Sequence, residues 1–134
     1  MKKIVIASSA KFQNEIKYWK EYFEERKYEV INYPKKVDLA NIEEVKKIHL
    51  KFFETLNECD ILFVLNEDKE NINGYIGPET FAELSFVLAN NILNKSSQKI
   101  YLKKMPSRKV SCYEEIDRFI KLGWIEIFKS NEEQ

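Results

Sequence analysis

Two carboxylates four residues apart are the side chains of this sequence best suited to covalent chemistry. Glu79 and Glu83 follow Pro78, which marks the start of an expected helix. The partial positive charge at a helix amino terminus favours the ionised carboxylate, which is the nucleophilic form. Glutamate in a first turn also simply complements the helix dipole, and this is the interpretation that we prefer for Glu79.

The helical pattern around Glu83 favours a solvated position. Glu83 lies about 200° around the helix from Phe81, whose side is shared by the apolar residues Leu84, Leu88 and Ile92. Glu83 is therefore expected to face away from the core. Phe86 and Val87 lie next to that face, which is unusual for open solvent. A second subunit covering the face would explain them, so we expect a homodimer or higher homo-oligomer.

A second polar group follows the first expected strand. Ser8, Ser9 and Lys11 offer two hydroxyls and an ammonium beside the free N–H groups of a helix start, an arrangement that binds anions. Either serine is equally suited to be a helix N-cap. The sequence does not contain GxxxxGK[ST], which excludes a P-loop. It does not contain GxGxxG either, so we do not expect a dinucleotide site of the usual kind.

The histidine and cysteine content excludes other chemistries. His49 is the one histidine, and Cys59 and Cys112 stand far apart, so no zinc site of usual spacing is expected. His49 falls within a helical pattern, and no GxSxG motif accompanies it to suggest a serine hydrolase. The separated cysteines indicate reduced thiols and a cytoplasmic protein.

The length of the chain and its net charge limit the classes of binding partner that we expect. The 134 residues make one domain, and 22 basic against 22 acidic residues give a formal net charge of zero. Proteins that bind nucleic acid polymers usually carry a basic excess, and we interpret the basic run at 99–109 as solvated. No stretch approaches the roughly 18 apolar residues needed to cross a bilayer. We therefore expect neither a nucleic acid polymer nor a membrane as partner.

The elements that must position these residues alternate along the chain. Short apolar runs predict strands, and apolar residues at intervals of three and four predict helices. Strands are expected at 3–7, 28–33, 60–66, 99–102 and 124–128, and helices at 10–26, 45–56, 78–94 and 111–122, the last with Ser111 as N-cap. We expect residues 1–129 to form a single domain and residues 130–134 a polar tail.

This alternation predicts a three-layer α/β domain of the flavodoxin-like or Rossmann-like kind. Right-handed crossovers favour a five-stranded, mainly parallel sheet of order 2-1-3-4-5, with the strand at 60–66 in its centre. Ligands bind to such sheets at the carboxyl ends of the strands, where the order reverses. Residues 7–12, residues 66–77 and Pro78 are therefore expected to surround one site.

The segments KKIVIASSAKF (2–12) and CDILFVLNEDKENINGYIGPETFAELSFVLAN (59–90) resemble the nucleoside 2-deoxyribosyltransferase-like family. This family includes 2′-deoxynucleoside 5′-monophosphate N-glycosidases. Its pattern is an apolar strand preceded by Asp, a glycine-containing loop and a helix of the form [ST]-x-x-E-[LI]-x-[YF]-A. The sequence supplies Asp60, Gly74, Gly77 and the run 80–86, with Val87 where the pattern usually has Ala.

The resemblance implies that Glu83 attacks C1′ of a deoxyribosyl group, expels the base and forms a covalent sugar ester. Water or a second base then completes the cycle, and no metal or organic cofactor is required. It also places Ser9 and Phe12 in a ligand-binding loop and Asn66 within hydrogen-bonding reach of base or sugar. The residues expected to bind this small nucleoside or nucleotide are Ser8, Ser9, Lys11, Phe12, Asn66, Tyr75, Gly77 and Glu79.

Departures from the family pattern keep other functions open. Ser8 replaces a glycine that the family commonly has, and Asn66 replaces a position that is often acidic, so no residue is assigned to protonate the leaving base. Tyr75 either donates that proton or packs. A non-catalytic nucleotide-binding or sensing module is the alternative function, and the abundant Tyr and Trp leave a flavin binder as a third.

Overall fold

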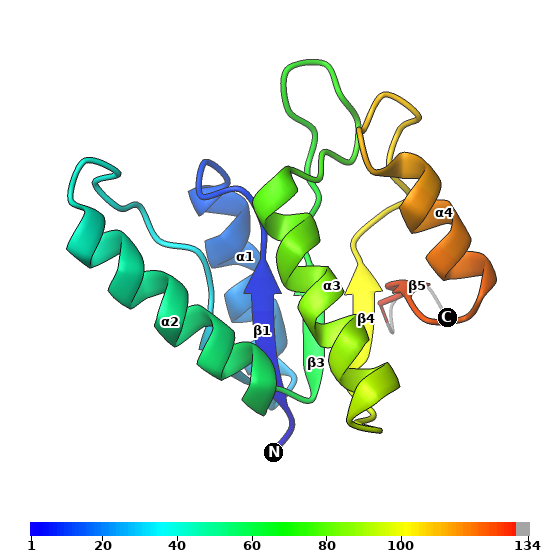
Figure 1. Ribbon diagram of the computed structural model, residues 1–134, viewed down its shortest axis with the longest axis horizontal. Coiled ribbons are helices and arrows are strands. Elements are labelled where there is room, and N and C mark those ends of the chain that lie inside the picture. Colours follow the sequence, from blue (N-terminus) through cyan, green and yellow to red (C-terminus); the bar gives the residue numbers. More distant parts are fainter. Residues whose placement is uncertain (131–134) are drawn as a thin grey trace.

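A five-stranded parallel sheet organises the protein, whose computed structural model describes residues 1–130 (Figure 1). Its strands are β1 (Lys3–Ala7), β2 (Glu29–Asn32), β3 (Ile61–Val64), β4 (Lys99–Leu102) and β5 (Glu126–Ile127). Their spatial order is β2-β1-β3-β4-β5, and every pairing is parallel. The α/β class, the strand order and the central place of β3 are therefore confirmed.

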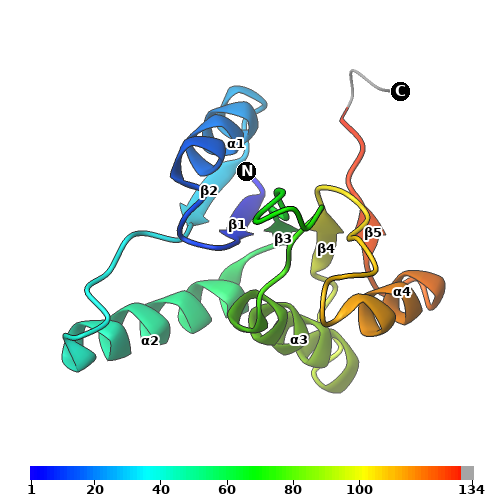
Figure 2. The same ribbon diagram turned by 90° about the horizontal axis from the view of Figure 1, so that it is seen from above.

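Four helices cover the sheet unequally. They are α1 (Gln13–Glu25), α2 (Ile42–Glu58), α3 (Pro78–Leu93) and α4 (Tyr113–Lys121). Seen from above, α1 lies alone on one face, whereas α2, α3 and α4 lie side by side on the other (Figure 2). All four residues of β3 are buried, as the continuous apolar run predicts for a strand covered on both faces.

Each face of the sheet carries its own hydrophobic core. Under α2, α3 and α4 the core includes Val5, Leu56, Leu62, Leu84 and Ile116, all fully buried or nearly so. Under α1 the core is more aromatic, and the ring of Phe63 lies 5.0 Å from those of both Trp19 and Phe23. These two cores fix the carboxyl ends of the strands relative to the helices that follow them.

Several elements start later than the sequence pattern suggests. Helix α1 begins at Gln13 because the N–H of Phe12 donates to the carbonyl of Ser9 in a tight turn (3.2 Å), which leaves Phe12 as the N-cap. Neither serine caps α1, so that alternative is wrong. Helix α4 begins after Cys112, which makes no side-chain cap, so Ser111 is not its N-cap either.

The carboxyl-terminal part of the chain is shorter in regular structure than expected. Strand β5 has two residues and pairs with β4 alone, at one edge of the sheet. Of the polar tail expected at 130–134, residues 131–134 lie outside the described part of the chain. Within residues 1–130, no helix combines the length and the apolar character needed to span a bilayer.

Candidate functional site

A cavity of about 530 Å³ opens at the carboxyl edge of the sheet, among the segments that follow β1, β2 and β3, and the strand order reverses between β1 and β3. This edge of the sheet faces the top of Figure 1, where the loops after the strands gather. Its walls come from the loop after β1, the link from β2 to α2, α2 itself, the loop after β3 and the start of α3. Both its size and its position suit a small ligand, as the topology predicts.

Glu83 lines this cavity and is only 5% exposed. The expectation of a solvated Glu83 is therefore wrong. Helix α2 packs against α3 on the side that was expected to face solvent, and Val87 is fully buried. The ring of Phe86 lies 5.4 Å from that of Phe53 on α2. Because α2 of the same chain covers this side, no second subunit is needed to explain these apolar residues.

The electrostatic setting of Glu83 favours its neutral form. Burial raises the pKa of the Glu83 carboxyl to about 8, and the negative charge of Glu79 one turn earlier adds to this effect. Within the described part of the chain, the carboxyl has no hydrogen bond or ion pair to offset the burial. At pH 7 the carboxyl is thus mostly protonated in the free protein, and it gains charge just above neutrality.

Glu79 lies at the mouth of the same cavity. One of its carboxylate oxygens, Oε1, is 3.7 Å from Nε2 of His49 on α2, and both side chains are well exposed. An exposed pair of this kind adds little to stability. Glu79 lies in the first turn of α3, which agrees with the preferred interpretation that its charge complements the helix dipole.

The loop after β1 contributes to the cavity through three of its four expected residues. Ser8, Ser9 and Lys11 line it. Both hydroxyls are engaged within the loop: Ser8 Oγ donates to the carbonyl of Ser9 (3.0 Å), and Ser9 Oγ accepts from the N–H of Lys11 (3.3 Å). Phe12 is not brought to the cavity, because its ring is buried in the core between α1 and the sheet.

Asn66 is also kept away from the cavity. It is 1% exposed, and its Nδ2 donates to the carbonyls of Lys104 (2.7 Å) and Gly74 (3.3 Å). Its Oδ1 accepts from the N–H of Lys104 (3.2 Å). The side chain that was expected to contact base or sugar is thus occupied in joining the loop after β3 to the loop after β4.

Further contacts fasten these two loops together. Lys103 pairs with Glu67, and Lys104 Nζ lies 2.6 Å from Asp68 Oδ1. Gly74 has a φ of +65°, and a Cβ there would lie 2.9 Å from a backbone atom of the other loop. Glycine is therefore required both by the backbone conformation and by the close approach. We call these paired segments, residues 66–77 and 103–108, the loop clamp.

The loop clamp presents Tyr75 and Gly77 to the cavity, as expected. A Cβ on Gly77 would lie 3.1 Å from the Tyr75 hydroxyl oxygen, so glycine lets the phenol rest on the backbone that starts α3. The ammonium of Lys69 lies 4.5 Å from the centre of the Tyr75 ring. The ring is therefore packed between the helix start and a cation.

Sequence reasoning missed the wall formed by the β2–α2 link and α2. The basic side chains lining the cavity there and in the loop after β3 are Lys35, Lys47, His49, Lys51 and Lys69. The spacing of Lys47 and Lys51 on one face of a helix was the one available signal. Among residues 1–130, no group of three or more His, Cys, Asp or Glu side chains is arranged to hold a metal ion.

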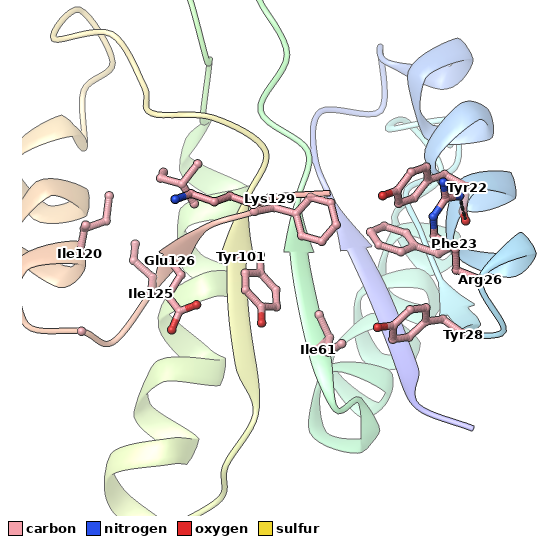
Figure 3. Close-up of a pocket in the computed structure, with 13 residues that line it drawn as sticks. Tyr22, Phe23, Arg26, Tyr28, Ile61, Tyr101, Ile120, Ile125, Glu126 and Lys129 are labelled. Carbon is pink, nitrogen blue, oxygen red and sulfur yellow. Dashed lines mark hydrogen bonds between the residues drawn. The ribbon is translucent and has the colours of Figure 1, made fainter. Parts of the chain in front are cut away.

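A second cavity, of about 610 Å³, lies on the opposite face of the sheet, where α1 alone provides cover (Figure 3). Tyr28 and Tyr101 stand on either side of Ile61 along its floor. Its one carboxylate, Glu126, is exposed. The cavity that contains Glu83 is the better candidate, because it combines a buried ionisable group with the topological switch point.

Comparison with known proteins adds a likeness of fold. No family model matches the chain, and no curated protein matches it. A solved structure, that of the CMP N-glycosidase BcmB of Clostridium botulinum, is similar over 96% of this chain and 93% of that chain. The TM-score is 0.57 and the sequence identity is 15%, so the likeness shows that the two chains share a fold.

Proposed function

We propose that this protein cleaves or transfers the N-glycosidic bond of a 2′-deoxynucleoside or of its 5′-monophosphate. The observation that carries the proposal is the Glu83 carboxyl, which is buried in the cavity at the switch point of the sheet and has no hydrogen-bond or ion-pair partner among residues 1–130. The motif around Glu83 and the fold shared with a CMP N-glycosidase both support this reaction class.

Glu83 acts as the nucleophile in this scheme. The carboxyl attacks C1′ in its ionised form, the C1′–N bond breaks, and the electron pair leaves with the base, which takes up a proton from water; this predicts that turnover rises as the pH approaches about 8. A water molecule or a second base then attacks C1′ and frees the carboxylate. This is the two-step route of retaining glycosidases, and it needs neither metal nor organic cofactor.

The Glu83→Gln variant tests the proposal. The protein is incubated with each deoxynucleoside and deoxynucleotide, with and without a second base, and free base is followed by chromatography. We expect release of base by the wild type, none by Glu83→Gln and full release by Glu54→Gln, a matched change at an exposed position of α2. A covalent deoxyribosyl adduct on Glu83 should appear by mass spectrometry. Unchanged turnover in Glu83→Gln would remove the assigned mechanism.

A non-catalytic nucleotide-binding module is the alternative function. The observation that favours it is Asn66, a neutral amide that has no acidic proton to give to a leaving base and that is held within the loop clamp by three hydrogen bonds. This alternative predicts saturable nucleotide binding without release of base in the same panel. Release of free base by the wild type and not by Glu83→Gln would exclude the non-catalytic alternative.

Assembly and location complete the proposal. We propose a homo-oligomer, which the exposed apolar side chains Leu50 and Phe53 of α2 support. Light scattering at micromolar concentration should give at least twice the chain mass, and a monomer would contradict it. The unpaired thiols of Cys59 and Cys112 support a cytoplasmic location.

A further inference from the structure

The cavity around Glu83 is lined by more positive than negative side chains. Two carboxylates, Glu79 and Glu83, face five lysines that come from four separate segments: Lys11, Lys35, Lys47, Lys51 and Lys69. Within residues 1–130, none of these lysines forms an ion pair with a carboxylate. In a chain of zero net charge, this is a local concentration of uncompensated cations that suits an anionic ligand.

Lys35 is the cavity lysine that the fold holds most firmly. Its Nζ donates to Oδ1 of Asn32 at 3.0 Å and lies 4.4 Å from the centre of the Tyr33 ring. Asn32 ends β2 and is itself buried, with 7% exposure. Its Nδ2 donates to Oγ1 of Thr55 at 3.1 Å, and that hydroxyl donates to a carbonyl within α2. A chain of hydrogen bonds thus runs from the interior of α2 to the Lys35 ammonium.

The ammonium of Lys35 has unused binding capacity. It carries three donors, of which two are directed to Asn32 Oδ1 and, at 3.5 Å, to the carbonyl of Tyr33. Although Lys35 is an exposed residue, desolvation lowers the pKa of its ammonium, and no carboxylate of residues 1–130 pairs with it. A bound anion would supply such a partner. In the loop after β1, the Ser8 hydroxyl donates to the carbonyl of Ser9, whereas the Ser9 hydroxyl oxygen accepts from the N–H of Lys11 and its proton remains able to donate.

We propose that Lys35, positioned by Asn32 and Thr55, binds the phosphate of a 5′-phosphorylated nucleotide and so selects nucleotides over nucleosides. The identity of the rest of the ligand rests on the proposed function. The other lysines attract the dianion to the cavity, and Lys35 makes the direct charge-assisted hydrogen bond. The phosphate subsite is therefore centred on the β2–α2 side of the cavity, where Lys35 lies.

Binding of ribose 5-phosphate, compared with ribose, tests Lys35 without any turnover. By calorimetry we expect ribose 5-phosphate to bind the wild type more tightly than ribose does, and the affinity to fall about ten-fold or more in Lys35→Gln. Lys35→Arg should keep most of the affinity because it keeps the charge. Lys36→Gln is the matched control, since Lys36 is exposed and does not line the cavity.

The inference is overturned if ribose 5-phosphate binds no better than ribose, or if Lys35→Gln and Lys36→Gln have equal effects. Turnover gives the second readout. In Lys35→Gln, kcat/KM for a nucleoside monophosphate should fall about ten-fold through KM, so that the preference for the monophosphate over the matching nucleoside shrinks by about the same factor. Equal cleavage of both substrates by the wild type also contradicts the inference. If nothing is cleaved, the proposed function fails, and ribose 5-phosphate binding still decides the role of Lys35.

Discussion

Replacing Glu83 with glutamine should make the protein more stable at neutral pH while abolishing turnover. Burial and the charge of Glu79 raise the pKa of Glu83 from an ordinary 4.5 to about 8. A carboxyl with a raised pKa prefers its protonated form in the folded state. Its contribution to stability is therefore complete below about pH 4.5 and is lost as the pH rises through about 8. Glutamine has nearly the same shape and does not titrate.

The size of the effect follows from the two pKa values. One pKa unit corresponds to about 1.4 kcal/mol. Because the carboxyl ionises in the unfolded chain while it stays protonated in the folded one, the unfolding free energy of the wild type falls by about 1 kcal/mol near pH 5, about 3 near pH 7 and about 4 near pH 8. The advantage of Glu83→Gln over the wild type should grow by these amounts and level off above about pH 8.

Urea unfolding at several pH values measures this advantage, with the fluorescence of Trp19 and Trp124 as the signal. The matched control is Glu54→Gln, an exposed position for which the difference from the wild type should stay small at every pH. A difference for Glu83→Gln that does not change between about pH 5 and about pH 8 would refute the raised pKa of Glu83. It would also weaken the case for Glu83 as a group poised in a desolvated cavity.

Three further predictions concern the same site. Glu79→Gln removes a charge that raises the pKa of Glu83, so the pH midpoint of kcat/KM should move to lower pH, and an unmoved midpoint would argue against this coupling. Gly74→Ala should cost about 2 kcal/mol or more in urea unfolding, since a φ of +65° and a close backbone contact both oppose the new methyl group. Gly123→Ala, at a φ of +75° in open space, should cost about half as much, and equal losses would exclude a steric part. Asn66→Ala should cost about 1–3 kcal/mol and speed proteolysis of residues 66–77, whereas wild-type digestion would show that the loop clamp does not depend on this amide.

The sheet could be predicted because its signals are local and redundant. Five apolar runs separated by amphipathic segments leave few right-handed arrangements, and the strand order then places the site. Pro78 after Gly77 marked the start of α3 correctly. The segments that line the cavity from the β1, β3 and α3 sides followed from the topology.

The side of α3 that carries Glu83 could not be predicted, because periodicity assigns a helix one buried face. Helix α3 has two buried faces. Leu84 and Leu88 pack in the core beneath the helix, whereas Glu83 and Val87 are buried toward α2. A polar residue between two packed helices has the same local pattern as one in solvent. Only the tertiary structure distinguishes them.

The position of Lys35 at the cavity could not be predicted for a different reason. The link from β2 to α2 has no periodicity, so its residues carried no signal of direction. Lys35 is positioned by the hydrogen bond that its ammonium donates to Oδ1 of Asn32. In the sequence pattern, Asn32 is simply the polar residue at the end of a strand. Phe12 and Asn66 show the reverse case, since residues close to the switch point were taken by the core and by the loop clamp.

The loop clamp makes one wall of the cavity more firmly held than the wall formed by the link from β2 to α2. The side that holds Tyr75 and the start of α3 is tied to a second loop by ion pairs and by Asn66, so changes there disturb the reacting groups. The link at 33–41 is joined to the rest of the fold at its start, where Lys35 donates to Asn32 and the carbonyl of Pro34 accepts from Gln13 Nε2 at 3.3 Å, and its hydrogen bonds near Asp38 are local. Ligand preference can therefore be re-engineered by exchanging this link, including its length, while the reaction geometry around Glu83 is preserved.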